Sequence, residues 1–202
     1  MSFDIQRAQA FLAPLTGRTA IFLLESRGAN LSFARAIISL LAQAGDGCAV
    51  VDLDAFYSSN SDRIFTTLAQ ATSTAMAIRV PEPGADVEGD FSTIFEAPQR
   101  AVIIDSLNSF YHLVSQEDGS SRSRKLMFAV ASLSYYARAN GKIVIFSMYR
   151  REGFTRGRTS RSISSLSDIT ASVDIRGGEV VFRSERGSGW PGEKFSIRIP
   201  LG

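Results

Sequence analysis

Residues 19–44, TAIFLLESRGANLSFARAIISLLAQA, decide the fold of this chain. The stretch begins with an apolar strand from Thr19 to Leu24, which runs into a short polar turn that contains Gly28. An amphipathic helix follows from about Asn30 and ends at Gly45. Its apolar residues recur at helical spacing, at Leu31, Ala34, Ile37, Ile38 and Leu41. A buried strand that turns directly into a helix predicts an α/β fold.

The turn in this stretch stands where a P-loop protein carries its phosphate-binding loop. That loop has the pattern G-x-x-x-x-G-K-[ST], in which backbone N–H groups cradle phosphates and the Lys reaches the terminal ones. Over the eight positions here, Glu25 replaces the first Gly and Asn30 the second. Leu31 replaces the Lys, and Ser32 alone keeps the hydroxyl that would bind magnesium. We interpret the stretch as a nucleotide-binding scaffold that has lost its nucleotide chemistry.

Composition limits the class of protein. The chain has 202 residues with 45% hydrophobic content, which suits one ordered α/β domain with a sizeable core. No apolar run is long enough to span a membrane, and the first residues lack the apolar core of a signal peptide. Cys48 is the only cysteine, so no disulfide within the chain and no cysteine-based metal site is expected. We therefore expect a reducing compartment, the cytoplasm, or the nucleus in a eukaryote.

The rest of the chain alternates predicted helices with predicted strands. Strands are expected at 48–53, 75–80, 101–106 and 142–147, and helices at 3–16, around 91–97 and from about Ser123 to Ala139. The helices then stop, and three strands follow at 169–176, 179–185 and 194–199, the first two joined by a tight hairpin at Gly177-Gly178. This order predicts a mostly parallel central sheet flanked by helices, with antiparallel C-terminal strands.

We expect a single domain over residues 1–202, because no linker or internal repeat divides the chain. It comprises an N-terminal helix (1–16), an α/β core (17–149), a basic mobile loop (150–167) and C-terminal strands (168–202).

Several segments, in order, resemble the core ATPase domain of the RecA/RadA recombinase family. VVDLDAFYSSNSDRI is similar to a strand and loop of that family and puts Asp54 at the position of its catalytic carboxylate. VIIDSLNSF resembles the Walker B strand, with Asp105 at the acidic position. KIVIFSMY resembles the strand that ends in T-N-Q, with Ser147, Met148 and Tyr149 in those places. The resemblance covers about residues 17–202 and implies a RecA-like core.

The departures from the family pattern imply a pseudo-ATPase. Leu31 cannot supply the positive charge of the missing Lys, and Tyr149 cannot replace the amide of the sensor Gln. Phosphoryl transfer depends on positioned positive charge, so we expect no catalytic residue, no metal site and no cofactor, with weak binding of ATP and magnesium left open. The degenerate nucleotide site would comprise Gly28, Asn30, Leu31, Ser32, Asp54 and Asp105. The plainer interpretation makes Asp105 a cap at a strand end and Asp54 a solvated loop acid.

Basic residues gather in two segments. The first is the arginine-rich stretch, where the resemblance implies a mobile DNA-binding loop; the second is expected in the loop before the long helix. The candidate nucleic-acid-binding residues are Arg150, Arg151, Phe154, Arg156, Arg158 and Arg161, with Arg122, Arg124 and Lys125. Arg pairs with phosphate, and Arg or Phe stacks on bases, so the pattern predicts a single-strand binder. Docking on an acidic protein, or a solvated loop without a role, are the alternatives.

The leading expectation is a non-catalytic RecA/RadA-like paralogue that binds single-stranded DNA and assists homologous recombination or DNA repair. Its expected partners are a recombinase or RecA-like paralogue subunits, in a homo- or hetero-oligomer. One alternative is a ring-forming scaffold that binds tRNA, as the resemblance to Elongator accessory subunits would imply. Another is a RecA-like regulator that acts only through protein contacts.

Overall fold

The computed structural model describes residues 5–26, 28–65, 76–81, 96, 98–113, 119–150, 165, 167–186 and 194–198. The strands are β1 (Arg18–Leu24), β2 (Cys48–Asp52), β3 (Met76–Arg79), β4 (Ala101–Asp105), β5 (Ile143–Tyr149), β6 (Ile169–Arg176), β7 (Glu179–Arg186) and β8 (Lys194–Arg198). The helices are α1 (Ile5–Leu12), α2 (Ala29–Ala44), α3 (Phe56–Ser59), α4 (Ser61–Phe65), α6 (Leu107–Leu113) and α7 (Gly119–Asn140), with a 3-10 turn at Ala13–Leu15.

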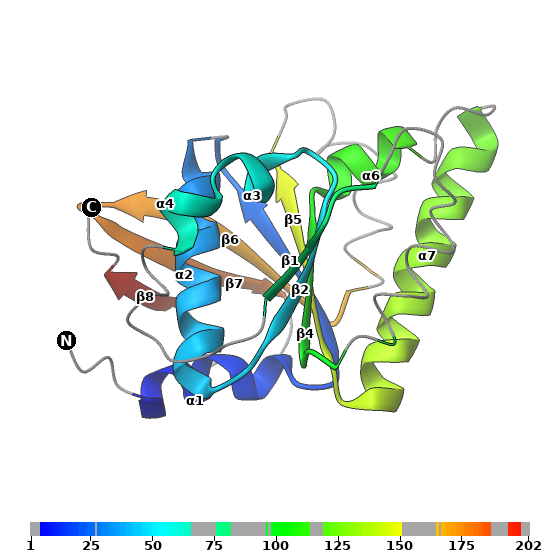
Figure 1. Ribbon diagram of the computed structural model, residues 1–202. Helices are drawn as coiled ribbons and strands as arrows, with labels where there is room; N and C mark the ends of the chain where they lie inside the picture. The colour runs from blue at the N-terminus through cyan, green and yellow to red at the C-terminus, as the bar shows by residue number, and fades with distance from the viewer. Residues whose placement is uncertain are drawn as a thin grey trace.

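All the described strands belong to one sheet, in the order β3-β2-β4-β5-β1-β6-β7-β8 (Figure 1). The pairs from β3 through β6 are parallel, and β6–β7 and β7–β8 are antiparallel. Parallel strands are covered on both faces, and β1, β2, β4 and β5 are accordingly buried almost throughout. The α/β prediction, with a mostly parallel sheet and antiparallel C-terminal strands, is confirmed.

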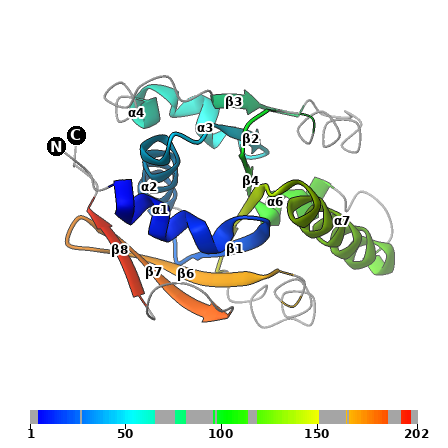
Figure 2. The ribbon, with the colours of Figure 1, turned by 90° about the horizontal axis from the view of Figure 1, so that it is seen from below.

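Helices cover the two faces of the sheet and make two hydrophobic cores (Figure 2). One core joins α1 and α2 to one face, and β6, β7 and β8 extend it. The other core joins α6 and α7 to the opposite face. Asp52, Asp105 and Ser147 each come two residues after a strand residue of the first core. Side chains two residues apart on a strand point to the same face, so all three point to the face that α2 covers.

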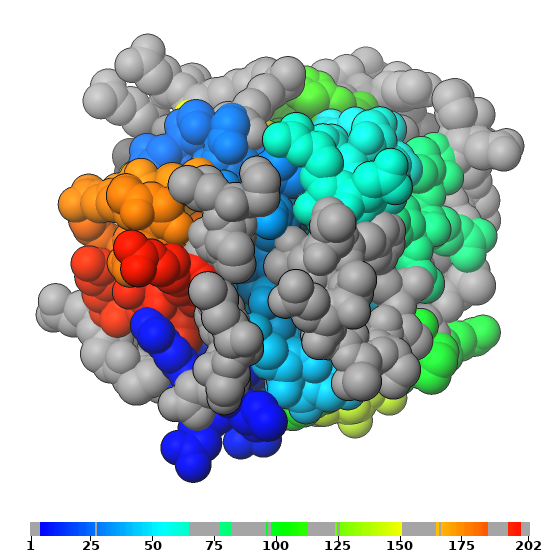
Figure 3. Space-filling view, turned by 60° about the vertical axis from the view of Figure 1, so that its left-hand side comes forward, coloured from blue at the N-terminus to red at the C-terminus, as the bar shows by residue number. Residues whose placement is uncertain are grey.

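Helix α1 lies against β8 at the surface of the molecule (Figure 3), and its Ala8, Phe11 and Leu12 belong to the first core. The ring of Phe11 lies 5.0 Å from that of Phe182 on β7 and 4.8 Å from that of Phe195 on β8, measured between centroids. Arg7 places its guanidinium 5.4 Å from the Phe195 ring centroid and donates to the backbone oxygen of Ser196. The N-terminal helix and the last described strands therefore share one core.

Two turns follow directly from glycines in the sequence. Gly45 ends α2 with φ 78°, and its N–H donates to the Ala42 oxygen at 3.1 Å, while Asp46 N–H donates to the Leu41 oxygen at 2.9 Å. This is a Schellman motif, which requires a left-handed residue after the helix. Gly177 and Gly178 both have positive φ in the β6–β7 hairpin, as a two-residue turn of this kind demands.

One helix was not predicted, and one helix boundary was wrong. Residues after Ser106 form a helix, α6, which had no place in the prediction; its apolar Leu107 and Phe110 are buried. Helix α7 begins at Gly119, so Arg122, Arg124 and Lys125 lie on a helix and not in a loop. Long Arg and Lys side chains are good helix formers, and a hydrophilic segment therefore extends an amphipathic helix beyond its apolar part.

Cys48 is buried in β2, as the sequence predicts. The described helices include none that is both long and apolar enough to cross a membrane. The predicted helix around Phe91–Ala97 and the arginine-rich stretch after Arg150 lie almost wholly outside the described residues.

Candidate functional site

The expected nucleotide site lies where β1, β2, β4 and β5 end and α2 begins (Figure 1). These strands are parallel, so their carboxyl ends meet at one edge of the sheet. Ligands of open α/β sheets bind in the crevice outside this edge. Asn30 comes from α2, Asp105 from β4, and Ser147 and Tyr149 from β5, and the structure brings all four together.

Asn30 is the centre of this network. Its side chain is 1% exposed, and its amide nitrogen donates to Asp105 Oδ2 at 3.2 Å and to the Tyr149 hydroxyl at 2.7 Å. The residue in place of the second P-loop Gly is thus bonded to the expected Walker B carboxylate and to the residue at the sensor position. We call Asn30, Asp105, Ser147 and Tyr149 the buried network.

Asp105 is fully buried without a cation among its hydrogen-bond donors. Ser147 Oγ donates to Oδ1, and Asn30 donates to Oδ2. Burial raises the pKa of Asp105 from 3.8 to about 6; these two hydrogen bonds lower it, and the charges of Asp54 and Asp52 raise it further. The carboxylate is therefore stabilised only by neutral donors, and a further negative group beside it would be repelled.

Asp54, expected at a catalytic position, is exposed and holds the start of α6. Ser106 Oγ donates to Asp54 Oδ2 at 2.9 Å, and Ser109 Oγ donates to Oδ1. Ser106 is also the N-cap of α6, because its Oγ accepts the Ser109 N–H at 3.3 Å. The plainer interpretation made Asp105 a cap, but the cap of α6 is the next residue, Ser106. Asp105 instead joins β4 and β5 to α2 through Ser147 and Asn30.

Asp52 is a site residue that the sequence reasoning missed. It is buried at the end of β2, in register with Asp105, and accepts the N–H groups of Phe56 and Ser58, both at 2.7 Å. These bonds fix the start of α3. The sequence marks only an Asp at the end of a buried strand, because the N-cap position of α3 is Ala55 and the partners of Asp52 are backbone N–H groups.

The other members of the predicted site lie along the start of α2. Gly28 is the residue before the helix, and the Ala29 N–H donates to the Ser26 oxygen at 3.1 Å. Leu31 packs partly against the first core, and Ser32 is half-buried. An apolar side chain that helps to fill the core therefore stands where a P-loop needs an ammonium group.

Two buried polar atoms near the network have no hydrogen-bond partner among the described residues, Asn30 Oδ1 and the Tyr57 hydroxyl. Tyr57 is fully buried on α3, and its pKa is raised well above its ordinary value by burial first and then by the charge of Asp105. The Asn30 amide and the Tyr57 ring are thus both packed inside the protein. Charge on Tyr57 is disfavoured, so its hydroxyl stays protonated.

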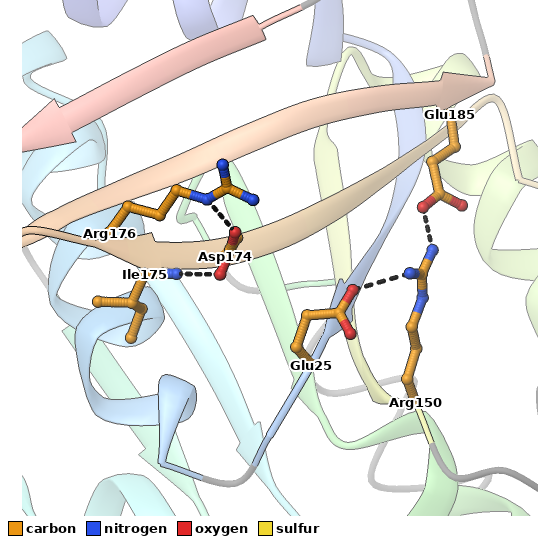
Figure 4. A network of polar contacts seen from close by, with 6 residues as sticks. All are labelled: Glu25, Arg150, Asp174, Ile175, Arg176 and Glu185. Atoms are coloured by element: carbon orange, nitrogen blue, oxygen red, sulfur yellow. Dashed lines mark hydrogen bonds and ion pairs between the residues drawn. The ribbon is translucent and has the colours of Figure 1, made fainter.

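Arg150, directly after β5, lies between two glutamates (Figure 4). Its guanidinium pairs with Glu25 Oε1 at 2.7 Å and with the carboxylate of Glu185 at the end of β7. Its backbone N–H donates to the Leu24 oxygen at 2.9 Å. The first arginine of the predicted binding stretch is therefore an ion-pair bridge between the ends of β1, β5 and β7.

Some of the remaining predicted nucleic-acid-binding residues lie outside the described residues, and the others lie on α7. Arg151, Phe154, Arg156, Arg158 and Arg161 lie outside the described residues. Arg124 lies on α7 with its side chain exposed. Arg122 and Lys125 lie on the same helix, but only their backbone is described.

The described part of the site offers carboxylates, amides and hydroxyls. It holds no group of three or more His, Cys, Asp or Glu residues arranged to bind a metal ion. Asp105, Asp52 and Asp54 would repel a triphosphate, and the one described cation at its edge, Arg150, is engaged by two carboxylates. The described polar side chains of the site are bound to one another or to backbone groups.

Comparison with known proteins gives no match to a family model and no curated protein of similar sequence. Function must therefore be inferred from the residues of the chain and their geometry.

Proposed function

We propose that this chain is a non-catalytic RecA/RadA-like recombinase paralogue that binds single-stranded DNA and assists homologous recombination or DNA repair. The α/β sheet with its helix after β1 is the framework on which such a protein depends. Binding would be carried by the arginine-rich stretch after β5, and partner subunits would be a recombinase or further copies of a RecA-like chain.

The bond from Asn30 to both Asp105 and Tyr149 is the observation that supports the non-catalytic half. In an active ATPase of this plan, the corresponding three positions face nucleotide and magnesium. Here they bind one another inside the protein, and Leu31 adds an apolar contact where the phosphate-binding cation is needed. ATP would have to break the buried network and to place its phosphates beside Asp105, while Arg150 at the edge of the site is already paired with two glutamates.

The DNA-binding half rests on the composition of the stretch from Arg150 to Arg161. It has several arginines, no lysine and one aromatic residue, Phe154, which together suit phosphate contacts and base stacking. Arg150 differs from the others because two glutamates hold it. Its expected contribution is to fix the direction in which the stretch leaves β5, and the phosphate contacts would come from the arginines that follow.

Fluorescence anisotropy tests this half with labelled single-stranded DNA and with folded tRNA at low and at moderate salt. The test variant replaces Arg151, Arg156, Arg158 and Arg161 with Ala. A matched control removes four other exposed arginines, Arg63, Arg79, Arg176 and Arg198. We expect salt-sensitive DNA binding that the test variant loses and the control keeps, because each phosphate contact releases counterions.

Three outcomes contradict this proposal in different ways. Binding that both variants lose equally reflects net charge alone. A clear preference for tRNA favours the ring-forming scaffold, and absence of binding to either nucleic acid favours a protein-interaction module.

The non-catalytic half is tested by ATP turnover and by binding of a fluorescent ATP analogue with magnesium. We expect no turnover by the wild type and none by Leu31→Lys, because the buried network still occupies the site. Leu31→Ala controls for the lost apolar contact. Turnover by wild-type protein would refute the pseudo-ATPase assignment, and turnover restored by the single Lys would show that the network is no obstacle.

A further inference from the structure

Helix α7 exposes two aromatic rings. Phe128 is 75% exposed and Tyr135 is 76% exposed, the highest values among the large hydrophobic side chains of the described residues. Neither ring stacks on another described ring. Single exposed hydrophobic side chains are ordinary, but two rings this open on one helix make it a candidate contact surface.

The two rings lie on the same side of α7. Positions seven apart in a helix differ by only about 20° around the axis and are separated by about 10 Å along it. Arg124 lies one turn before Phe128 on the same side, and the exposed Ala131 and Ser132 separate the rings. The opposite side holds the buried Val130, Leu133 and Ala137. We call Arg124, Phe128, Ala131, Ser132 and Tyr135 the α7 stripe.

The charge of α7 selects an anionic partner. Its sequence, GSSRSRKLMFAVASLSYYARAN, has four cationic residues and no Asp or Glu. One of them, Arg138, pairs with Asp168 at the C-terminal end of the helix. The other three fall in the first two turns, at the end of the helix that lies level with the end of β5, where the arginine-rich stretch begins (Figure 1).

We infer that the α7 stripe is a second contact surface for the same single-stranded nucleic acid, with Phe128 and Tyr135 stacking on unpaired bases and Arg124 contacting phosphate. This inference rests on the proposed function, which supplies the strand, and extends it down the outer side of α7. Base faces are available for stacking only when the bases are unpaired, so the stripe selects single strands over duplex.

A protein partner fits this stripe less well. A helix that docks in an apolar protein groove presents apolar anchors at i, i+3, i+4 and i+7, whereas the small Ala131 and Ser132 stand three and four residues after Phe128. The exposed positions of α7 whose side chains are described carry no Leu, Ile, Val or Met. They present flat rings separated by small residues, and such rings accept any base because every base has a flat π-face.

The test compares a labelled thymidine homopolymer with a strand of equal length that has the same sugar-phosphate backbone but no bases. The stacking variant is Phe128→Ala with Tyr135→Ala. The matched controls are Ser132→Ala on the same stripe and the pair Phe128→Tyr with Tyr135→Phe, which keeps both rings. All changed side chains are exposed, and thermal denaturation checks that each variant keeps wild-type stability.

We expect wild-type protein to bind the homopolymer more tightly than the abasic strand. The stacking variant should bind the homopolymer about tenfold or more weakly and the abasic strand as before, and both controls should behave as wild type. Arg124→Ala should weaken binding to both strands and reduce the salt slope by about one phosphate contact.

Failure of the inference is distinguishable from failure of the proposed function. If wild-type protein binds neither strand, the proposed function is wrong and the inference falls with it. If wild-type protein binds the homopolymer but the stacking variant binds it equally well, the inference alone is overturned. Self-association of the wild type that the stacking variant loses, measured by sedimentation, would assign the stripe to a second copy of the chain and also overturn it.

Discussion

At the scale of single residues, Asp105 decides how the site behaves. Burial among neutral donors disfavours the charged form of this carboxylate and raises its pKa to about 6. Asn30 and Ser147 offset part of that cost by hydrogen bonding. The side chain thus contributes geometry, by joining α2 to β4 and β5, at the expense of stability near neutral pH.

Replacement of Asp105 by Asn should stabilise the protein at neutral pH and reduce its pH dependence. The folded pKa of about 6 lies above the ordinary 3.8, so between these values the folded state binds more protons than the unfolded chain. Stability from this group is present below about pH 4 and is lost as the pH rises through about 6, by on the order of 3 kcal/mol. The free Asn30 Oδ1 can accept a hydrogen bond from the new amide once Asn30 turns over.

Thermal denaturation from pH 4 to 8 checks this expectation. The difference in Tm between Asp105→Asn and wild type should grow with pH over the window given above. Parallel curves, or a variant that is less stable at every pH, would contradict the assigned pKa shift. Ser147→Ala, which removes a donor from the carboxylate, should move the stability in the opposite direction.

Cys48 should react slowly in the folded protein. Burial raises the pKa of its thiol from 9.0 to about 12, so at pH 8 the thiolate fraction falls about a thousandfold, and the side chain is also closed to solvent. Alkylation by iodoacetamide, followed by mass spectrometry, should be slow in buffer and rapid in denaturant. Equal rates in both conditions would show that β2 opens readily.

At the scale of elements, helix ends and strand ends position the site. The N-terminus of α2 presents Asn30, the end of β4 presents Asp105, and the end of β5 presents Ser147 and Tyr149. Asn108 secures α6 to β5, because its Oδ1 accepts the Tyr149 N–H at 2.8 Å. Each element therefore holds one part of the network, and a shift of α2 would separate them.

The end of α2 offers a test of one such boundary. Gly45→Ala should destabilise the protein by about 1 kcal/mol, because φ 78° is costly for a residue with a Cβ. No heavy atom lies within 4 Å of a Cβ built there, so the cost is conformational and not steric. Gly45→Asn should cost less, since Asn tolerates this conformation, and urea denaturation of both variants measures the difference. Equal losses would point to a packing effect.

At the scale of the whole molecule, the two ends of the chain stabilise each other. The Phe11 ring of α1 meets rings of β1, β7 and β8 within the first core. The antiparallel strands at the C-terminal end thus need α1 to cover their inner face. The sheet and its N-terminal helix should unfold as one cooperative unit.

Phe11→Ala tests this dependence. It should destabilise the protein by about 3 to 5 kcal/mol, because a fully buried ring is lost and the cavity cannot collapse. Ile5→Ala on the same helix, at a side chain that is 57% exposed, is the matched control and should change stability by less than about 0.5 kcal/mol. A separate early transition for the C-terminal strands in Phe11→Ala, seen by hydrogen exchange, would show that they unfold independently.

The sequence by itself determined the α/β class, with a mostly parallel sheet, antiparallel C-terminal strands and flanking helices. Continuous apolar runs such as Val102–Ile104, in a chain that alternates strands with helices, favour strands of a sheet covered on both faces, and glycine after an amphipathic run favours the end of a helix. Helix α6 and the first turns of α7 were not predicted. The short segment after Asp105 mixes apolar and polar residues without a long helical pattern, and the hydrophilic residues before Leu126 predict a loop as readily as a solvated helix. Asp52 escaped because its two N–H partners are backbone groups.

Only the tertiary structure decided how those residues relate. Asn30, Asp105 and Tyr149 are far apart in sequence, and their mutual hydrogen bonds exist because parallel strands bring their ends to one edge. The same holds for Arg150, whose charge suggested phosphate binding and whose actual neighbours are Glu25 and Glu185. Local patterns fix which elements form, since they depend on near neighbours, whereas burial and pairing depend on which distant residues the sheet brings together.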